Sequence, residues 1–187
     1  MSHEREGWAR VAGEGLEGAS GAGLELELEP TLHFSDSLSL ELGLGVQHLP
    51  DWLLWRGGNR LGSYRADLAT LGASLQWQIG HRQELRVKLE TIALDARLRQ
   101  AWAVRADGEP IATATPADIT DFSLANLGFQ VRYRYELAPL SYLYVVSARG
   151  GYEQRTGTEG VEDLLQDSFR LRDDEQLVVK LSYRFEI

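Results

Sequence analysis

The sequence feature that most constrains the fold is a strict alternation of leucine with polar residues between residues 23 and 47. Leucine alternates with glutamate from Leu24 to Glu29, and after a short Ser-Asp-Ser it alternates with Ser, Glu and Gly as far as Gln47. Successive side chains of a strand point to opposite faces, whereas a helix of this pattern would place leucine all around its axis. The stretch is therefore predicted to form a β-hairpin with one apolar and one polar face.

The same alternation returns along the rest of the chain. It predicts strands at residues 64–79, 85–104, 127–135, 142–148 and 177–187, preceded by a weak strand at 5–15 and a Gly-rich link that ends near residue 22. Short turns are predicted at 80–83 and 138–139, and long connections at 49–62, after 104 and at 150–173, the last with a helical turn at 161–166. This arrangement predicts an all-β fold, an antiparallel up-and-down β-barrel of about eight strands or the C-terminal segment of a larger transmembrane barrel.

One residue conflicts with a regular strand in the first arm of the hairpin. Pro30 cannot donate a ladder hydrogen bond, so it belongs at a sheet edge or a bulge. Because the alternation continues through Pro30 undisturbed, an edge position is favoured.

Composition restricts the possible functions further. The chain of 187 residues has the size of one domain, and its net charge of −9 argues against a nucleic-acid partner. It has no cysteine, which excludes disulfides and sulfur-ligated metals, and no apolar run long enough for a transmembrane helix. The N-terminus lacks the apolar core of a signal peptide, so an exported form is expected to be a mature form, a fragment or a domain of a longer precursor.

Two kinds of protein fit a sheet with one leucine face. A transmembrane barrel turns the leucines to lipid, and a soluble barrel or sandwich turns them inward, where they could bind a small apolar ligand. Four features favour the membrane barrel: the strand length, the alternation of long and short connections, the clustered aromatic residues and an amphipathic last strand. The residues predicted to face lipid are Leu24, Leu26, Leu28, Leu38, Leu40, Leu42, Leu44, Phe129, Val131, Tyr133, Leu177, Val179, Leu181, Tyr183 and Phe185.

Charged residues occupy the opposite face of these strands, acidic early in the chain and basic later. In an eight-stranded barrel they are expected to fill the interior with salt bridges, because such a barrel has no room for a channel. In a wider barrel they would instead line a pore that selects solutes. The charges predicted to face the interior are Glu25, Glu27, Glu29, Glu41, Arg86, Lys88, Arg132, Arg134, Lys180 and Arg184.

The C-terminal third resembles a known protein family. The run from Asp121 to Ser147, containing Leu-Gly-Phe-Gln-Val-Arg-Tyr-Arg-Tyr, and the run Asp174-Glu-Gln-Leu-Val-Val-Lys-Leu-Ser-Tyr-Arg-Phe resemble the end of an uncharacterised bacterial outer-membrane barrel family. Its members carry a carbohydrate-binding-like β-sandwich ahead of the barrel. The resemblance covers roughly residues 60–187 and implies a Gram-negative outer-membrane location, outer-membrane lipid as partner and missing upstream barrel strands. It brings no catalytic residues.

Three patterns that could carry chemistry are better explained by local structure. Gly13-Glu-Gly-Leu-Glu-Gly matches a dinucleotide-binding pattern but precedes a strand where that site needs a helix. His33, Ser35, Asp36 and Ser37 combine the residue types of a hydrolase in what is predicted to be a tight turn, where Ser and Asp are common. The four histidines lack the spacing of metal ligands. No catalytic, metal or cofactor site is therefore predicted, and the expected role is structural or porin-like transport.

Overall fold

The computed structural model describes residues 5–6, 9–12, 23–116 and 118–185 of the chain. The sequence predicts a first strand partly on the basis of Trp8. Trp8 and most of the Gly-rich link lie outside the described residues. The strands are β1 (Arg5–Glu6), β2 (Ala9–Ala12), β3 (Leu24–Leu28), β4 (Thr31–Ser35), β5 (Leu38–Trp55), β6 (Arg60–Ile79), β7 (Gln83–Val104), β8 (Pro110–Thr113), β9 (Phe122–Ala138), β10 (Ser141–Thr156) and β11 (Asp174–Ser182), with one helix, α1 (Val161–Ser168).

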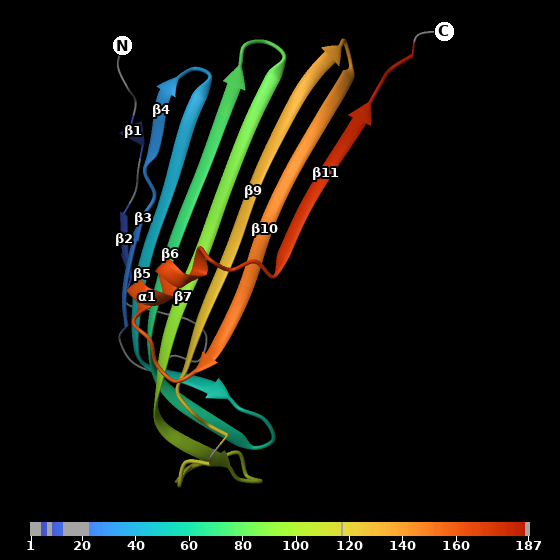
Figure 1. Ribbon diagram of the computed structural model, residues 1–187. Coiled ribbons are helices and arrows are strands. Elements are labelled where there is room, and N and C mark those ends of the chain that lie inside the picture. The colour runs from blue at the N-terminus through green and yellow to red at the C-terminus, as the bar shows by residue number, and fades with distance from the viewer. Residues whose placement is uncertain (1–4, 7–8, 13–22, 117, 186–187) are drawn as a thin grey trace.

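The strands form one antiparallel sheet in which neighbours in sequence are neighbours in space (Figure 1). Eleven strands occupy eight positions across it, because β1 and β2 share the first, β3 and β4 share the second, and β8 continues the position of β9. The prediction of an all-β, antiparallel, up-and-down fold is confirmed.

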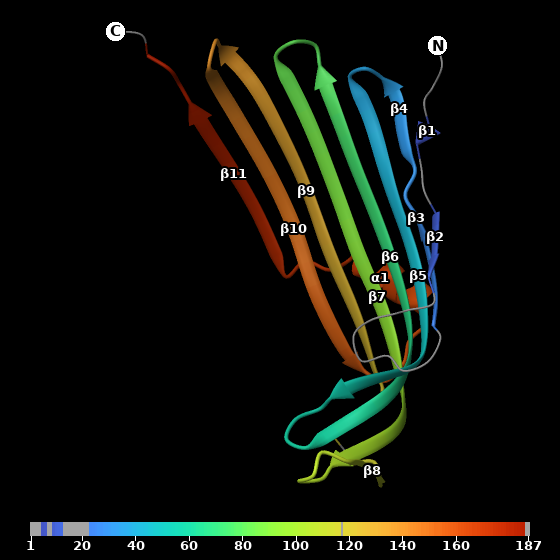
Figure 2. The ribbon, with the colours of Figure 1, turned by 180° about the vertical axis from the view of Figure 1, so that it is seen from behind.

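The sheet is open. Figure 2 shows β11 and the β1–β2 position at opposite sides of the sheet, and β11 pairs only with β10 among the described strands. The closed barrel expected from the sequence is therefore not present in this structure. The polar face carries Arg86, Arg132, Arg134 and Tyr144, large side chains that a closed eight-stranded interior would have to hold.

The hairpin that dominates the sequence forms as predicted, with β3 and β4 as one arm and the first half of β5 as the other. Leu28 lies opposite Leu44 and Thr31 opposite Glu41, so the register is the same on both sides of Pro30. Pro30 interrupts the arm without a bulge, and its carbonyl accepts a hydrogen bond from the amide of Leu42 at 3.0 Å. β1 and β2 pair with β4 and β3 on the outer side of this arm, but the residues between β1 and β2 lie outside the described residues, so the edge position of Pro30 stays a prediction.

The strands are longer than the alternation predicts, and the long loop expected at residues 49–62 is mostly strand. Pro50 and Asp51 lie in an irregularity of the β5–β6 ladder between Leu49 and Trp52, so these turn-forming residues interrupt pairing without ending the strand. The true turn covers residues 56–59, where Gly57 and Gly58 have φ values of 102° and 58°.

At the other end of the sheet the connections are tight, as predicted, at residues 36–37, 80–82 and 139–140. These three turns lie at the same edge of the sheet (Figure 1). The last strand ends at Ser182, so the prediction of a strand through Ile187 is wrong at its end: residues 183–185 are not strand, and 186–187 are outside the described residues.

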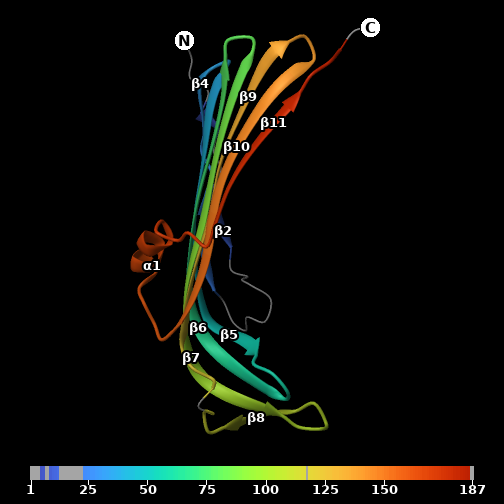
Figure 3. The ribbon, with the colours of Figure 1, turned by 45° about the vertical axis from the view of Figure 1, so that its right-hand side comes forward.

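The helical turn predicted in the connection between β10 and β11 is the eight-residue helix α1. Leu164 is buried against Ala93 of β7 and Ala125 of β9, and the Ser168 hydroxyl lies 2.6 Å from that of Thr91. Figure 3 shows α1 on one face of the sheet, while the lower ends of β5 to β8 turn toward the other. The face under α1 is called the convex face below, and the opposite face the concave face.

Candidate functional site

The convex face carries an apolar band formed by every second residue of the strands from β3 to β9; on β10 only Leu143 and Val145 belong to it, before Ser147 and Arg149. Opposite one another on it lie Leu42 and Ala73, and on the next strands Leu89 and Phe129. On β5 the band runs from Leu38 to Val46, nine residues or about 27 Å of extended chain. All residues of the predicted lipid-facing set that lie within described strands share this face.

Most of the band is uncovered. Leu44 is 46% exposed, Val46 52% and Val179 62%, and α1 covers only the part formed by the alanines. Soluble proteins rarely leave a contiguous apolar surface of this extent open, and larger patches mark contacts with partners or membranes.

Aromatic residues border the band at the edge with the tight turns. Trp77 and Tyr133 lie on either side of Leu85 on the convex face, and the Tyr133 hydroxyl donates to Gln83 at 2.8 Å. Tyr183 and Phe185 follow β11, with ring centroids 5.0 Å apart. Trp52 does not belong to this border: it packs against Phe122 on the concave side, with ring centroids 6.4 Å apart.

A row of polar side chains limits the band at the other end. The cross-strand neighbours His48, Asp67, Asp95, Ser123 and Arg155 form this row across five strands. On β10 the band stops earlier, at Arg149, whose guanidinium donates to the carbonyls of Phe169 and Leu171 beyond the end of α1. Along the strands, the convex face is thus apolar between the edge with the tight turns and this polar row, and polar beyond the row.

Sequence reasoning missed this polar row. The His48 Nδ1 atom lies 2.5 Å from a carboxylate oxygen of Asp67, and both line a cavity of about 320 Å³ beside the first residues of α1. A loop had been expected between these two residues, so their pairing could not be read from the sequence. Ser123 lies beyond Asp95 in the row, two strands away from Asp67. This spacing does not place the serine as a nucleophile beside the histidine.

The concave face holds the predicted interior charges. Glu25, Glu27 and Glu41 lie on it near one side of the sheet, and Arg86, Lys88, Arg132, Arg134 and Lys180 lie on it from β7 onward. Glu29 sits in the interruption before Pro30, and Arg184 follows β11, where its amide donates to the Ser141 hydroxyl at 3.0 Å.

The open sheet keeps the acidic and basic sets apart, because β6 lies between them. The basic side chains pair instead with acids of β7: Arg134 with Glu84 at 2.9 Å, Arg86 with the same carboxylate, and Lys88 with Glu90 at 2.7 Å. Glu84 and Glu90 are not among the charges that the sequence predicts to face the interior. These local pairs leave a concave surface with a high density of charge.

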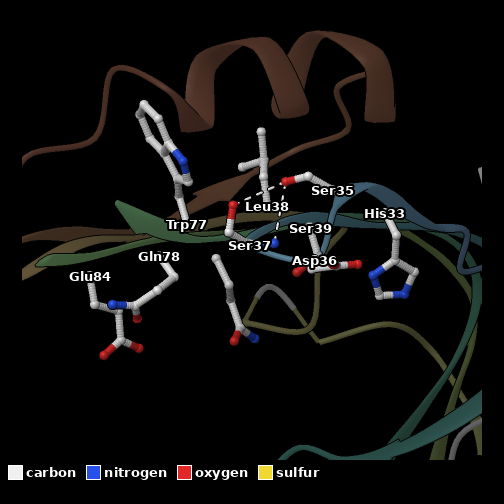
Figure 4. A pocket seen from close by; sticks show the side chains of 10 residues that line it. His33, Ser35, Asp36, Ser37, Leu38, Ser39, Trp77, Gln78 and Glu84 are labelled. Carbon is white, nitrogen blue, oxygen red and sulfur yellow. Dashed lines mark hydrogen bonds between the residues drawn. The ribbon is translucent and has the colours of Figure 1, made fainter. Parts of the chain in front are cut away.

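The Ser-Asp-Ser turn between β4 and β5 lines a cavity of about 280 Å³ (Figure 4). The hydroxyls of Ser35 and Ser37 lie 3.1 Å apart, and the Ser35 hydroxyl accepts the amide of Ser37 at 3.3 Å. The His33 ring points away from the two serines in Figure 4. The serines therefore bond to each other and to the backbone within the turn, as turn residues commonly do.

No group of three or more potential ligands suited to a metal ion occurs within the described part of the chain. Within the same residues, α1 is too short and too polar to cross a membrane, and no other helix is present there. The chain matches no family model and no curated protein sequence.

Proposed function

We propose that this chain forms the wall of a transmembrane β-barrel in a Gram-negative outer membrane, with a structural or porin-like transport role. The observation that carries the proposal is the uncovered apolar band on the convex face, opposite a charged concave face. A barrel in a bilayer has this polarity, apolar outside and polar inside.

The dimensions support the same proposal. Nine residues of β5 on the band match the roughly 9–11 residues with which a tilted strand crosses a bilayer. The tight turns share one edge, and the longer connections, including the one that holds α1, lie away from it (Figure 1). Bacterial barrels have this division between short periplasmic turns and long external loops.

An open edge cannot remain unpaired in lipid, because each unsatisfied backbone group there costs several kcal/mol. In the proposed barrel, β11 therefore pairs along its free side. Since the first and last positions of an eight-position up-and-down sheet run antiparallel, β11 can pair with the β1–β2 position, or both edges can join further strands of a wider barrel.

The proposal is tested by labelling two neighbours on β7 that point to opposite faces. The chain has no cysteine, so Leu89→Cys and Lys88→Cys each introduce a single attachment point for a fluorophore. After refolding into lipid vesicles, a lipid-soluble quencher should quench the label at 89 and not the label at 88. A label at Asp107→Cys, in the exposed turn beyond β7, is the control and should respond only to a water-soluble quencher.

A label at 89 that neither quencher reaches would show that the leucine face is an internal core. That result would overturn the membrane assignment in favour of a soluble barrel or sandwich.

A further inference from the structure

The lower end of the sheet folds over the concave face, as Figure 3 shows for β5 to β8. We call the segments 49–66, 94–116 and 118–122 the end cap. The β5–β6 ladder is irregular between Leu49 and Trp52 and the β6–β7 ladder between Ser63 and Tyr64, where the strands enter this region. Irregular pairing of this kind bends strands and increases their twist.

The end cap has its own apolar core, separate from the band on the convex face. Leu49, Tyr64 and Ile119 are at most 1% exposed, and Phe122 is 7% exposed. The rings of Tyr64 and Phe122 meet edge to face with centroids 5.3 Å apart, and the Arg56 guanidinium lies 5.3 Å from the Phe122 ring. This is the larger of the two clusters of buried apolar residues in the described chain, and it lies on the face that is otherwise charged.

Polar links tie the parts of the end cap together. Asn59 donates to the carbonyl of Val104 at 3.0 Å, and the Asp121 carboxylate accepts the amide of Leu98 at 2.7 Å. Arg60 pairs with Asp118 at 2.8 Å and holds the pKa of that carboxyl below its ordinary value, so the pair stays charged at neutral pH. The β5–β6 turn, the end of β7 and the segment before β9 are therefore held to one another.

We propose that, in a barrel wide enough to hold a lumen, the end cap closes one mouth of that lumen and limits the passage of polar solutes. This inference rests on the proposed function, in which the concave face is the lumen. A hydrated solute leaving the charged concave surface would have to displace the packed rings of Tyr64, Phe122 and Trp52, and apolar constrictions of this kind oppose the passage of water and ions.

The test is conductance in planar lipid bilayers, with potassium chloride as the only solute. The wild-type chain should insert and conduct weakly, and the double variant Tyr64→Ala/Phe122→Ala should conduct more by about tenfold, because loss of two buried rings removes the packing that holds the end cap. Trp55→Ala is the matched control, since Trp55 lies in the same hairpin but is 70% exposed, and its conductance should equal that of the wild type. Equal conductance of the wild type and the double variant would overturn the proposal.

A second measurement does not depend on the double variant folding. In wild-type background inserted in vesicles, Ile119→Cys should react with a membrane-impermeant maleimide on the order of tenfold more slowly than Asp107→Cys, because residue 119 is buried in the end cap. Equal rates would mean that the end cap is open and would also overturn the proposal. Lipid quenching at position 89 shows whether the chain has inserted into the membrane, whether or not the end cap is closed. It therefore separates a failure of the proposed membrane barrel from a failure of the proposed end cap.

Discussion

Leu42 and Glu41 are adjacent residues of β5 whose side chains lie on opposite faces of the sheet. Leu42 lies in the middle of the apolar band, opposite Ala73, and Glu41 lies on the charged face, opposite Thr31 and Ser74. The pair therefore offers a comparison of the two faces at the same height.

For this pair, Leu42→Arg should lower the stability of the chain folded in bilayers by about 2–4 kcal/mol, the cost of an arginine on the lipid face at the midplane. Glu41→Gln should change it by about 1 kcal/mol or less, since Glu41 is an exposed charge on the polar face and interactions between exposed charges contribute little. Urea titrations in lipid vesicles measure both values. Similar losses for the two variants would contradict the assignment of the faces.

Tyr64 is a second residue whose substitution should change the free energy of unfolding. Its ring is fully buried in the end cap, and its hydroxyl oxygen has no hydrogen-bond partner among the described residues. A buried polar atom without a partner costs roughly 1–3 kcal/mol, so Tyr64→Phe should raise the free energy of unfolding by about 1 kcal/mol. Chemical denaturation of the two proteins under identical conditions is the measurement, and a destabilised phenylalanine variant would mean that the hydroxyl is bonded.

At the scale of the elements, α1 shows how a short helix can be fixed by few contacts. Its first turn contains Glu162 and Asp163, which favourably oppose the positive N-terminal end of a helix. An isolated helix of eight residues is not stable in water, so its packing on the sheet must hold it. Leu164, only 2% exposed, is the centre of that packing.

Leu164→Ala should therefore release α1 while leaving the sheet intact, since a leucine-to-alanine change in a core costs about 2–5 kcal/mol. Hydrogen exchange of the amides of residues 161–171 should become much faster, with little change in β6, β7 and β9. Gln166→Ala is the control, because Gln166 is an exposed residue of the same helix. Unchanged protection in Leu164→Ala would mean that other contacts fix the helix.

At the scale of the whole molecule, the sheet combines a bare apolar band with an unpaired edge on β11. Either feature promotes association in water, the band by burial and the edge by strand pairing between molecules. The net charge of −9 opposes this association.

The chain should accordingly be monodisperse only in detergent or lipid, and should associate in plain buffer. Light scattering coupled to size-exclusion chromatography in both solvents measures this directly. A monodisperse monomer in buffer would favour the soluble alternative, and association that persists in detergent would indicate that the edges remain unpaired there.

The sequence by itself determined the local structure and the two faces of each strand. A two-residue period is a property of the extended backbone, so the alternation of Leu38 to Val46 with polar residues fixes which side chains share a face wherever the strand lies. The tight turns were predictable too, since they depend on residues close in sequence. The helix between β10 and β11 was predictable in position, but it is held by its packing on the sheet.

Only the tertiary structure decided where strands continue past turn-forming residues, and which residues of neighbouring strands lie opposite one another. Pro50 and Asp51 predicted a loop, but pairing with β6 and the core around Tyr64 and Phe122 carry β5 on to Trp55. The register that places His48 beside Asp67 depends on the irregularity at residues 49–52, which no local pattern encodes. Closure of the sheet is likewise a property of its two edges together, because it depends on strand tilt and on what pairs with β11.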